Sequence, residues 1–256
     1  MLLLQTHLFH AIGRFPFLIM VASIFVGSIA SGISASIFST ITVLFVILLG
    51  IYLTLIVSKI LSKTILKGIP SSFILELPPY RKPQIGKVIV RSLLDRTLYV
   101  LGRAIVVAAP VGIVIWLFAN IQLSGVSVLT HIALFLDPFA KLMGMDGYIL
   151  TAFILGIPAN EIVLPIILMS YMAKGSLVDL DDTYTIGNIL VQNGWTILTA
   201  INVMIFTLLH FPCSTTLLTI KKETGSWKWA IISFLLPTIF GIVICMCTTF
   251  LWNISY

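Results

Sequence analysis

Charged side chains are scarce in this chain of 256 residues, since Lys, Arg, Asp and Glu together make up only 9% of it. A soluble domain carries roughly 25% charged residues, which coat its surface. Apolar residues make up 59% of the sequence. This composition excludes a soluble enzyme, a disordered protein and a nucleic-acid-binding domain, and it predicts an integral membrane protein with several spans.

Cysteine is also rare, and the common phosphate-binding and hydrolase motifs are missing. Cys213, Cys245 and Cys247 lie in or beside apolar runs and predict no disulfide framework. The sequence has no Gly-x-x-x-x-Gly-Lys-Ser/Thr loop, so we expect no nucleotide site in this chain. It also lacks His-Glu-x-x-His and Gly-x-Ser-x-Gly, which are typical of metalloproteases and serine hydrolases. We therefore expect neither enzyme activity nor a tightly bound cofactor.

The basic residues are concentrated in one part of the sequence. The net charge is +6, and nine of the fifteen Lys and Arg residues lie between Lys59 and Arg103. Short basic segments that flank apolar spans usually stay in the cytoplasm. The charge therefore predicts that residues 59–96 are cytoplasmic and that the partner is a lipid bilayer, not nucleic acid.

The order of apolar runs predicts an all-α integral membrane fold, with about five or six apolar helices plus one or two re-entrant or broken helices. Residues 1–67 should form an amino-terminal membrane hairpin, and residues 68–97 a cytoplasmic connector that is first proline-rich and then amphipathic. Residues 98–256 should form a larger membrane domain. Within it, the apolar run at 126–136 is too short to span, so we expect a buried or re-entrant piece.

The run at 147–172 is long enough to span but is interrupted by the sequence GIPANE at 156–161. If it crossed straight through, the acidic connector at 173–194 would be inside and the basic loop at 221–228 outside. Both placements contradict the excess of positive charge on the cytoplasmic side. We therefore favour a re-entrant hairpin that turns at residues 158–160, with a straight crossing as the alternative.

Glu161 is the most informative residue of this interruption, because a charged side chain at membrane depth costs ~2.5–3.5 kcal/mol even on mild scales. Pro158 stops the first arm, and Asn160 can cap the second. Two interpretations stay open. Glu161 caps a half-helix or pairs with Arg103, or it is an ion ligand or proton relay at a broken-helix site. In either case we expect it in the protein interior.

A second break is predicted at residues 210–216, where Pro212 removes a backbone donor from the sequence HFPCSTT. His210 and Cys213 are three residues apart and can face the same way. Imidazole, thiolate, amide and hydroxyl groups together can hold a divalent metal, although packing and local backbone hydrogen bonds are the alternative roles. The candidate pathway residues are Asn160, Glu161, Asn202, His210, Cys213, Ser214 and Thr215, with Glu161 and Cys213 as transient metal ligands. We expect the two breaks to face each other, with Thr199, Asn202 and residues 214–216 on the same lining.

Three sequences give the chain a specific resemblance: GIPANEIVLPIILM at 156–169, LHFPCSTTLLTIKKETGSWKW at 209–229 and ELPPYRKP at 76–83. They resemble the carboxy-terminal membrane region of the ferrous iron transport protein B (FeoB) family, in which the third precedes the second Gate repeat. The resemblance implies a Gate-type domain at 98–256, multi-pass insertion in a bacterial inner membrane and transport of Fe²⁺. It also implies that the motif at Cys213 is part of the transport pathway.

The chain departs from the family pattern in its amino-terminal part. Family members begin with a GTPase domain and a first Gate repeat, and neither motif occurs in this sequence. The cysteine that the family pattern leads us to expect near Ala11 is also absent. The resemblance therefore implies a separate GTPase and first Gate polypeptide, or a homo-oligomer, as partner. A non-conducting regulatory membrane subunit and a Gate-type carrier of a nucleoside or another small solute remain as alternatives.

Overall fold

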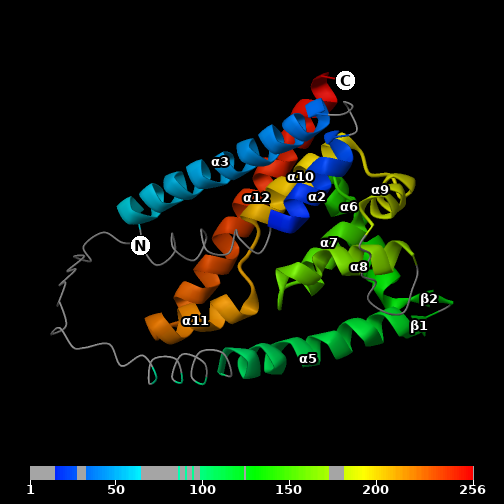
Figure 1. Ribbon diagram of the computed structural model, residues 1–256. Coiled ribbons are helices and arrows are strands. Elements are labelled where there is room, and N and C mark those ends of the chain that lie inside the picture. Colours follow the sequence, from blue (N-terminus) through cyan, green and yellow to red (C-terminus); the bar gives the residue numbers. More distant parts are fainter. Residues whose placement is uncertain are drawn as a thin grey trace.

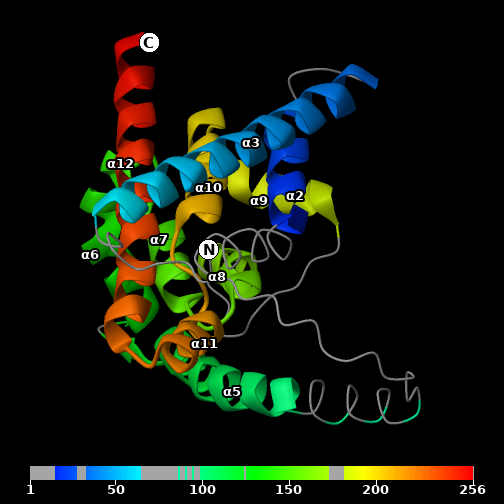
Figure 2. The same cartoon turned by 90° about the vertical axis from the view of Figure 1, so that its left-hand side faces the viewer.

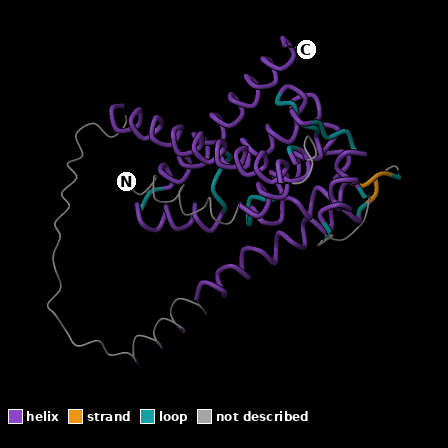
Figure 3. Tube along the Cα trace, turned by 45° about the horizontal axis from the view of Figure 1, so that its top comes forward, coloured by secondary structure: helices purple, strands orange, loops and turns teal. Residues whose placement is uncertain are grey.

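The computed structural model describes residues 15–27, 33–64, 86, 90, 94, 99–123, 125–172 and 182–255. This part of the chain is almost entirely helical. Its two strands, β1 (Gln122–Leu123) and β2 (Val126–Ser127), form one short antiparallel hairpin (Figure 3). The predicted helical class is confirmed for these residues. Nearly all of the predicted connector at 68–97 lies outside the described residues, and the division into three parts stays a prediction.

Helix α10 lies near the middle of the fold. In chain order the helices are α2 (Phe15–Phe25), α3 (Ile33–Thr64), α5 (Tyr99–Asn120), α6 (Val128–Leu142), α7 (Gly147–Leu155), the 3₁₀ turn η4 (Asn160–Ile162), α8 (Val163–Tyr171), α9 (Thr183–Gln192), α10 (Ile197–Leu209), α11 (Ser214–Thr224) and α12 (Trp227–Ser255). Two views show α3 and α5 on opposite sides of the molecule, with α10 between them (Figures 1 and 2).

Three helical segments are long and apolar enough to cross a membrane: Ile33–Ile56, Ile197–Thr224 and Trp227–Ser255. A fourth is added if α6 and α7, which are bent by 108° at the break between them, count as one span. The multi-pass character is therefore supported, but the expected five or six apolar helices are not confirmed. One physical reason is that α7 and α8 have nine residues each, or about 14 Å at 1.5 Å per residue, against a hydrocarbon core of about 30 Å.

Helices α2 and α3 pack against each other. The Ser39 hydroxyl of α3 donates to the Ala22 carbonyl of α2 over 3.2 Å. A Cβ added at Gly27 would lie 3.1 Å from the Ser39 hydroxyl oxygen. Small residues at this crossing let the two backbones approach closely, as is usual between membrane helices.

The bend between α6 and α7 depends on two glycines. Gly144 has a φ of +67°, which favours glycine, and a Cβ added at Gly147 would lie 1.9 Å from the Ala133 carbonyl oxygen. Asp146 caps α7 by accepting from the Ile149 amide over 2.7 Å. The short apolar run that we expected to be buried or re-entrant is thus the first arm of a bent helix pair, and its Leu129 and Ala133 are buried.

Helix α9 forms part of the acidic connector, of which residues 173–181 lie outside the described residues. Asp182 caps α9 and accepts from the Thr185 hydroxyl and from the amides of Tyr184 and Thr185. These hydrogen bonds, the one from the Thr185 side chain above all, lower the pKa of Asp182 below its ordinary value. The start of α9 is therefore stabilised by a charged cap.

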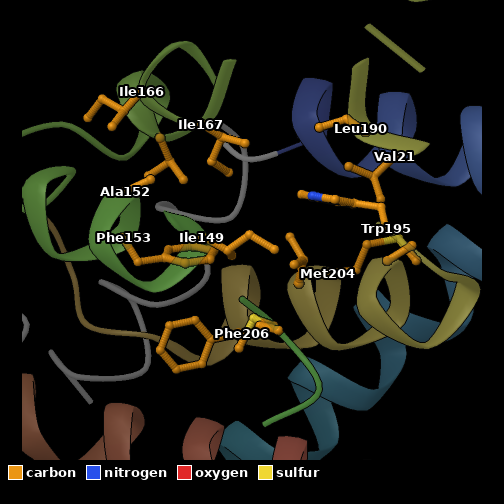
Figure 4. Packing of buried hydrophobic residues seen from close by; sticks show 14 of the residues in the cluster. Val21, Ile149, Ala152, Phe153, Ile166, Ile167, Leu190, Trp195, Met204 and Phe206 are labelled. Atoms are coloured by element: carbon orange, nitrogen blue, oxygen red, sulfur yellow. The ribbon is translucent and has the colours of Figure 1, made fainter. Parts of the chain in front are cut away.

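The core is centred on α10. Val203, Met204 and Phe206 of this helix are almost completely buried. Phe206 meets Phe153 of α7 edge to face, with ring centroids 4.9 Å apart. Figure 4 shows Phe153 and Ile149 of α7 packed over this face of α10, with Trp195 at its start. This packing positions the ends of α7 and α10, where both chain breaks occur.

Candidate functional site

The first break separates α7 from α8 and turns the chain back on itself. Gly156 caps α7, and a Cβ there would lie 2.5 Å from a methyl group of Val163. At the other end of the two arms, the Tyr171 hydroxyl, from the last residue of α8, donates to the Asp146 carboxylate at the start of α7. The arms are therefore antiparallel, and residues 147–171 have the hairpin shape that the charge pattern predicts.

The second break separates α10 from α11 and is bonded directly to the first. The amide of His210 closes the last turn of α10 by donating to the Phe206 carbonyl over 2.7 Å, and Pro212 has no amide to continue the ladder. The Ser214 amide then donates to the Ile157 carbonyl over 2.9 Å. The predicted approach of the two breaks is thus confirmed, and one of the backbone groups released by the first break is satisfied by the second.

His210 joins the breaks through its side chain. The ring is 1% exposed, and its Nδ1 lies 3.0 Å and 2.9 Å from the carbonyl oxygens of Phe206 and Thr207. Carbonyl oxygens only accept hydrogen bonds, so Nδ1 carries the proton and a neutral ring keeps its lone pair on Nε2. Nε2 lies 3.3 Å from Oδ1 of Asn160. A carbonyl partner on one ring nitrogen is also the usual way in which a metal-ligating histidine is oriented.

Three phenylalanines surround the imidazole. The ring of Phe206 stacks on it at 5.7 Å, and the rings of Phe153 and Phe211 meet it edge to face at 5.0 Å each. They come from α10, from α7 and from the break itself. These rings keep water from most of the imidazole. Its Nε2 faces Asn160 of the first break.

Cys213 caps α11 and is partly exposed. Its sulfur lies 3.0 Å from the Thr215 hydroxyl oxygen and 3.2 Å from that of Thr216. The Ser214 hydroxyl oxygen is buried and has no hydrogen-bond partner among the described residues. The amino-terminal end of a helix favours negative charge nearby. The break therefore gathers one thiol and three hydroxyls at the start of α11.

Glu161 does not lie where the sequence predicts. Its side chain is exposed, not interior. The reason is local, since residues 160–162 form a 3₁₀ turn in which Asn160 faces His210 and the next residue is directed elsewhere. The side chain of Arg103, its possible partner, lies outside the described residues.

Asn202 is also separate from the breaks, although it lies on the same stripe of α10 as His210. Its Nδ2 donates over 2.9 Å to both the Met143 carbonyl and the Thr249 hydroxyl, and its Oδ1 accepts from the Thr248 hydroxyl. Eight residues of helix place it about 12 Å along the axis from His210. The expectation that Asn202 shares the lining of the breaks is wrong, because α12 and the turn before α7 surround it.

One polar chain was not anticipated from the sequence. Trp195, just before α10, donates from Nε1 to the Tyr171 hydroxyl over 2.8 Å, and Tyr171 in turn donates to Asp146. Trp195 also stacks on Phe25 of α2 at 5.6 Å. In the sequence, these three residues are marked only by their position in or beside apolar runs. Their contacts could not be predicted, because the partners are more than twenty residues apart in the chain.

The described residues hold no group of three or more His, Cys, Asp and Glu side chains close enough for a metal ion.

Comparison with known families finds two matches along the chain. The family model described as "Ferrous iron transport protein B C terminus" matches residues 43–95. The Gate model, described as "Nucleoside recognition", matches residues 101–227 and so covers both breaks. No solved structure gives a significant match.

Curated relatives agree with the first of these models. A protein named Fe(2+) transporter FeoB from Staphylococcus aureus strain MSSA476 is 30% identical over 189 residues, which cover 71% of this chain and 27% of the relative. A protein of the same name from Methanocaldococcus jannaschii is 27% identical over 206 residues, covering 75% and 29%. A fusion of Fe(2+) transport protein A with FeoB from Porphyromonas gingivalis is 23% identical, covering 67% and 26%. The chain thus spans little more than a quarter of the length of these relatives.

Proposed function

We propose that this chain moves Fe²⁺ across a membrane as one part of a larger transporter. The premise is that the chain belongs to the ferrous iron transport protein B family and corresponds to its carboxy-terminal membrane region. The observation that carries the proposal is the contact between the two breaks, made by His210 with Asn160 and by Ser214 with Ile157. Paired breaks put polar atoms at membrane depth where protein, not lipid, surrounds them.

The ion would bind where these atoms meet. Nε2 of His210 and Oδ1 of Asn160 are 3.3 Å apart. Adjacent ligands of a tetrahedral site with bonds of about 2.1 Å are separated by about 3.4 Å, so the spacing suits two ligands of one ion. Cys213 is the next soft donor along the chain, and imidazole and thiolate are both suitable ligands for iron. Ser214 and Thr215 would add hydroxyl oxygens.

The same atoms explain how the ion could leave. With Nδ1 protonated, Nε2 of an ion-free His210 accepts a hydrogen bond, and the Asn160 amide supplies a donor if it turns over. With the cation present, the amide presents its oxygen instead. Rotation of one side chain then exchanges a hydrogen bond for a metal bond. A carrier has to release its cargo, and weak neutral ligands serve that need better than a cluster of carboxylates.

Glu161 takes a different role from the one that its sequence context suggests. Its exposed carboxylate follows directly after Asn160, so we assign it to the mouth of the site, where it attracts a cation before Asn160 and His210 bind it. Removal of the charge should weaken capture of the ion at low concentration without affecting folding.

The partner follows from the coverage of the relatives. Because the chain spans about 27% of the Staphylococcus aureus protein, we propose that a separate polypeptide with the GTPase and first Gate parts, or a second copy of this chain, completes the pathway. A bacterial inner membrane is the location that this assignment implies.

An uptake assay tests the proposal. The chain is expressed, with and without the GTPase and first Gate part of a relative, in bacteria that lack their own Fe²⁺ uptake, and radioactive iron is counted in the cells. We expect uptake only with both parts, and its loss in His210→Phe but not in His131→Phe. Normal uptake by the His210 variant would reject the site. If the GTPase and first Gate part took up iron without this chain, this chain would be a non-conducting subunit.

A second candidate function has one observation in its favour, the description "Nucleoside recognition" of the Gate model. The same cells should therefore be tested with radioactive uridine and adenosine. We expect no uptake above the empty vector, because the contact between the breaks presents a single amide, that of Asn160, to a base. Uptake of nucleoside in preference to Fe²⁺ would reverse the assignment.

A further inference from the structure

A basic turn joins the last two helices of the chain. Lys221 and Lys222 stand in the last turn of α11, Gly225 ends that helix with a φ of +66°, and Trp227 and Lys228 begin α12. Glu223 is the one acidic residue between positions 221 and 228, so the turn carries a net charge of about +2 at neutral pH. We name Lys221, Lys222, Trp227 and Lys228 the basic turn.

The turn lies where the bilayer surface should be. It separates two segments that are each long and apolar enough to span, Ile197–Thr224 and Trp227–Ser255. A connection of two residues between two spans has to stay at one membrane surface. Both views show α11 beside the first turns of α12 (Figures 1 and 2). We therefore expect the turn to lie among lipid headgroups.

The side chains of the turn are arranged for an anionic partner. The Lys221 ammonium lies 3.9 Å from the centre of the Trp227 ring, which fixes its position. Lys222 and Lys228 are exposed, and Trp227 is 56% exposed. None of these three lysines forms a salt bridge within the described residues, whereas Lys141, on α6, is paired with Asp137.

We propose that the basic turn binds the headgroup of an anionic phospholipid, with Lys222 and Lys228 on its phosphate and Trp227 at the level of the glycerol backbone. Charge complementarity and depth both favour this occupant over zwitterionic lipid, because interfacial lysines attract acidic headgroups and tryptophan prefers the same layer. The inference stands apart from the transport function, since it uses no residue of the two breaks.

The test measures which lipid stays on the protein. The full chain is reconstituted in nanodiscs of phosphatidylcholine and phosphatidylglycerol at four to one, extracted mildly, and its retained lipids are counted by native mass spectrometry. We expect the ratio of phosphatidylglycerol to phosphatidylcholine among the retained lipids to be at least about fivefold higher than in the nanodisc, which corresponds to one effective lysine at a membrane surface. The enrichment should disappear in the variant with Lys221→Gln, Lys222→Gln and Lys228→Gln.

Lys141→Gln is the matched control, because it removes one exposed lysine of the same domain that is already paired, and it should keep the enrichment. Trp227→Leu keeps every charge but frees Lys221 from its ring, and should reduce the enrichment without abolishing it. Thermal unfolding of each variant in detergent verifies that these exposed substitutions leave the fold intact.

Three results would overturn the proposal. If the unaltered chain retained the two lipids in the four-to-one ratio of the nanodisc, the basic turn would not distinguish anionic from zwitterionic headgroups. Displacement of phosphatidylglycerol by millimolar inorganic phosphate would assign the lysines to a soluble anion. Unchanged lipid retention in the triple variant, together with lost co-purification of a GTPase polypeptide, would assign them to a protein partner.

Discussion

Asn202 and His210 lie eight residues apart on α10, and both are buried to within 1% of complete coverage. Asn202 is in the middle of a continuous helix, and both ends of its amide bind hydroxyls or a carbonyl of neighbouring elements. His210 follows the end of the helix, contacts the other break over 3.3 Å and is close in sequence to a partly exposed thiol. The first region fixes packing, whereas the second brings polar atoms of two chain breaks together, and there we propose that a cation binds.

The difference comes from the backbone. Inside a helix every amide and carbonyl is occupied by the ladder, so a buried polar side chain has to find partners on other elements and then holds them together. At a break the backbone groups themselves need partners, and the Ser214 amide finds one on Ile157 of the facing break. Polar side chains beside such a junction are the groups to which we assign the cation. Substitutions around Asn202 should therefore lower the stability of the fold, whereas substitutions at the breaks should lower iron uptake.

Asn202→Leu should have the largest effect, and it should act on folding. The substitution leaves the Met143 carbonyl and the Thr248 and Thr249 hydroxyls without their amide partner, which should cost roughly 3 kcal/mol or more. Thermal unfolding of the purified chain measures this loss. Thr238→Val is the control, because the Thr238 hydroxyl bonds only within its own helix. Normal stability with lost iron uptake would place Asn202 in the pathway and erase the contrast between the regions.

His210→Phe should lower transport far more than it destabilises the fold. Phenylalanine keeps a ring among Phe153, Phe206 and Phe211 but removes Nε2, so iron uptake should fall about tenfold or more, as for loss of a metal-orienting group. Loss of the Nδ1–H that donates to the Phe206 and Thr207 carbonyls should cost only about 1 kcal/mol of stability. The measurement is initial uptake divided by the amount of protein in the membrane. His131→Phe serves as the control, since His131 is exposed on α6. If the abundance of the His210 variant fell as far as that of Asn202→Leu, His210 would belong to the packing region.

Cys213→Ser should lower uptake by less than His210→Phe does, because oxygen replaces sulfur and the neighbouring hydroxyls remain. We expect a shift in metal preference away from softer divalent ions, measured by competition with Zn²⁺ and Mn²⁺ during uptake. Cys247→Ser, at an exposed position of α12, should leave both uptake and preference unchanged. An identical shift in the two variants would contradict a ligand role for Cys213.

Tyr171→Phe removes the hydroxyl that links Trp195 to Asp146 at the base of the α7–α8 hairpin. The expected loss of stability is about 1–2 kcal/mol, because Trp195 Nε1–H loses its acceptor and the Asp146 carboxylate loses a donor. Because the tip of the hairpin keeps its bonds to the second break, uptake per molecule should fall only slightly. Tyr184→Phe, at a residue 78% exposed, is the stability control. A loss of uptake as large as that of His210→Phe would show that the base of the hairpin sets the geometry of the breaks.

Glu161→Gln should have the smallest effect. An exposed carboxylate stabilises the fold little, so unfolding should be unchanged. Uptake should fall at low Fe²⁺ concentration and recover at saturation, which a concentration series separates. A fall in the saturating rate would move Glu161 from the mouth into the site itself.

The two breaks were predicted from Pro158 and Pro212 together with the polar residues beside them, since proline alone is not sufficient: Pro110, Pro138 and Pro237 stand inside continuous helices. The hairpin shape of α7 and α8 was predicted from the charge pattern around that interruption. The sequence could not separate Asn202 from His210, since helical spacing gives the face of a residue but not the element that covers it. Glu161 was misplaced for a related reason, as the cost of burial says nothing about a 3₁₀ turn that directs the side chain outward. The Trp195, Tyr171 and Asp146 chain needs three-dimensional contact to be seen.

Protection of Cys213 from alkylation tests most directly whether the paired breaks bind the cargo. In a Cys247→Ser background the reactive thiol is the partly exposed Cys213, because Cys245 is buried. We predict that Fe²⁺, added without oxygen, slows maleimide modification of Cys213, that Mg²⁺ does not, and that His210→Phe removes the protection. Equal rates with and without Fe²⁺, or full protection in the His210→Phe variant, would contradict the account.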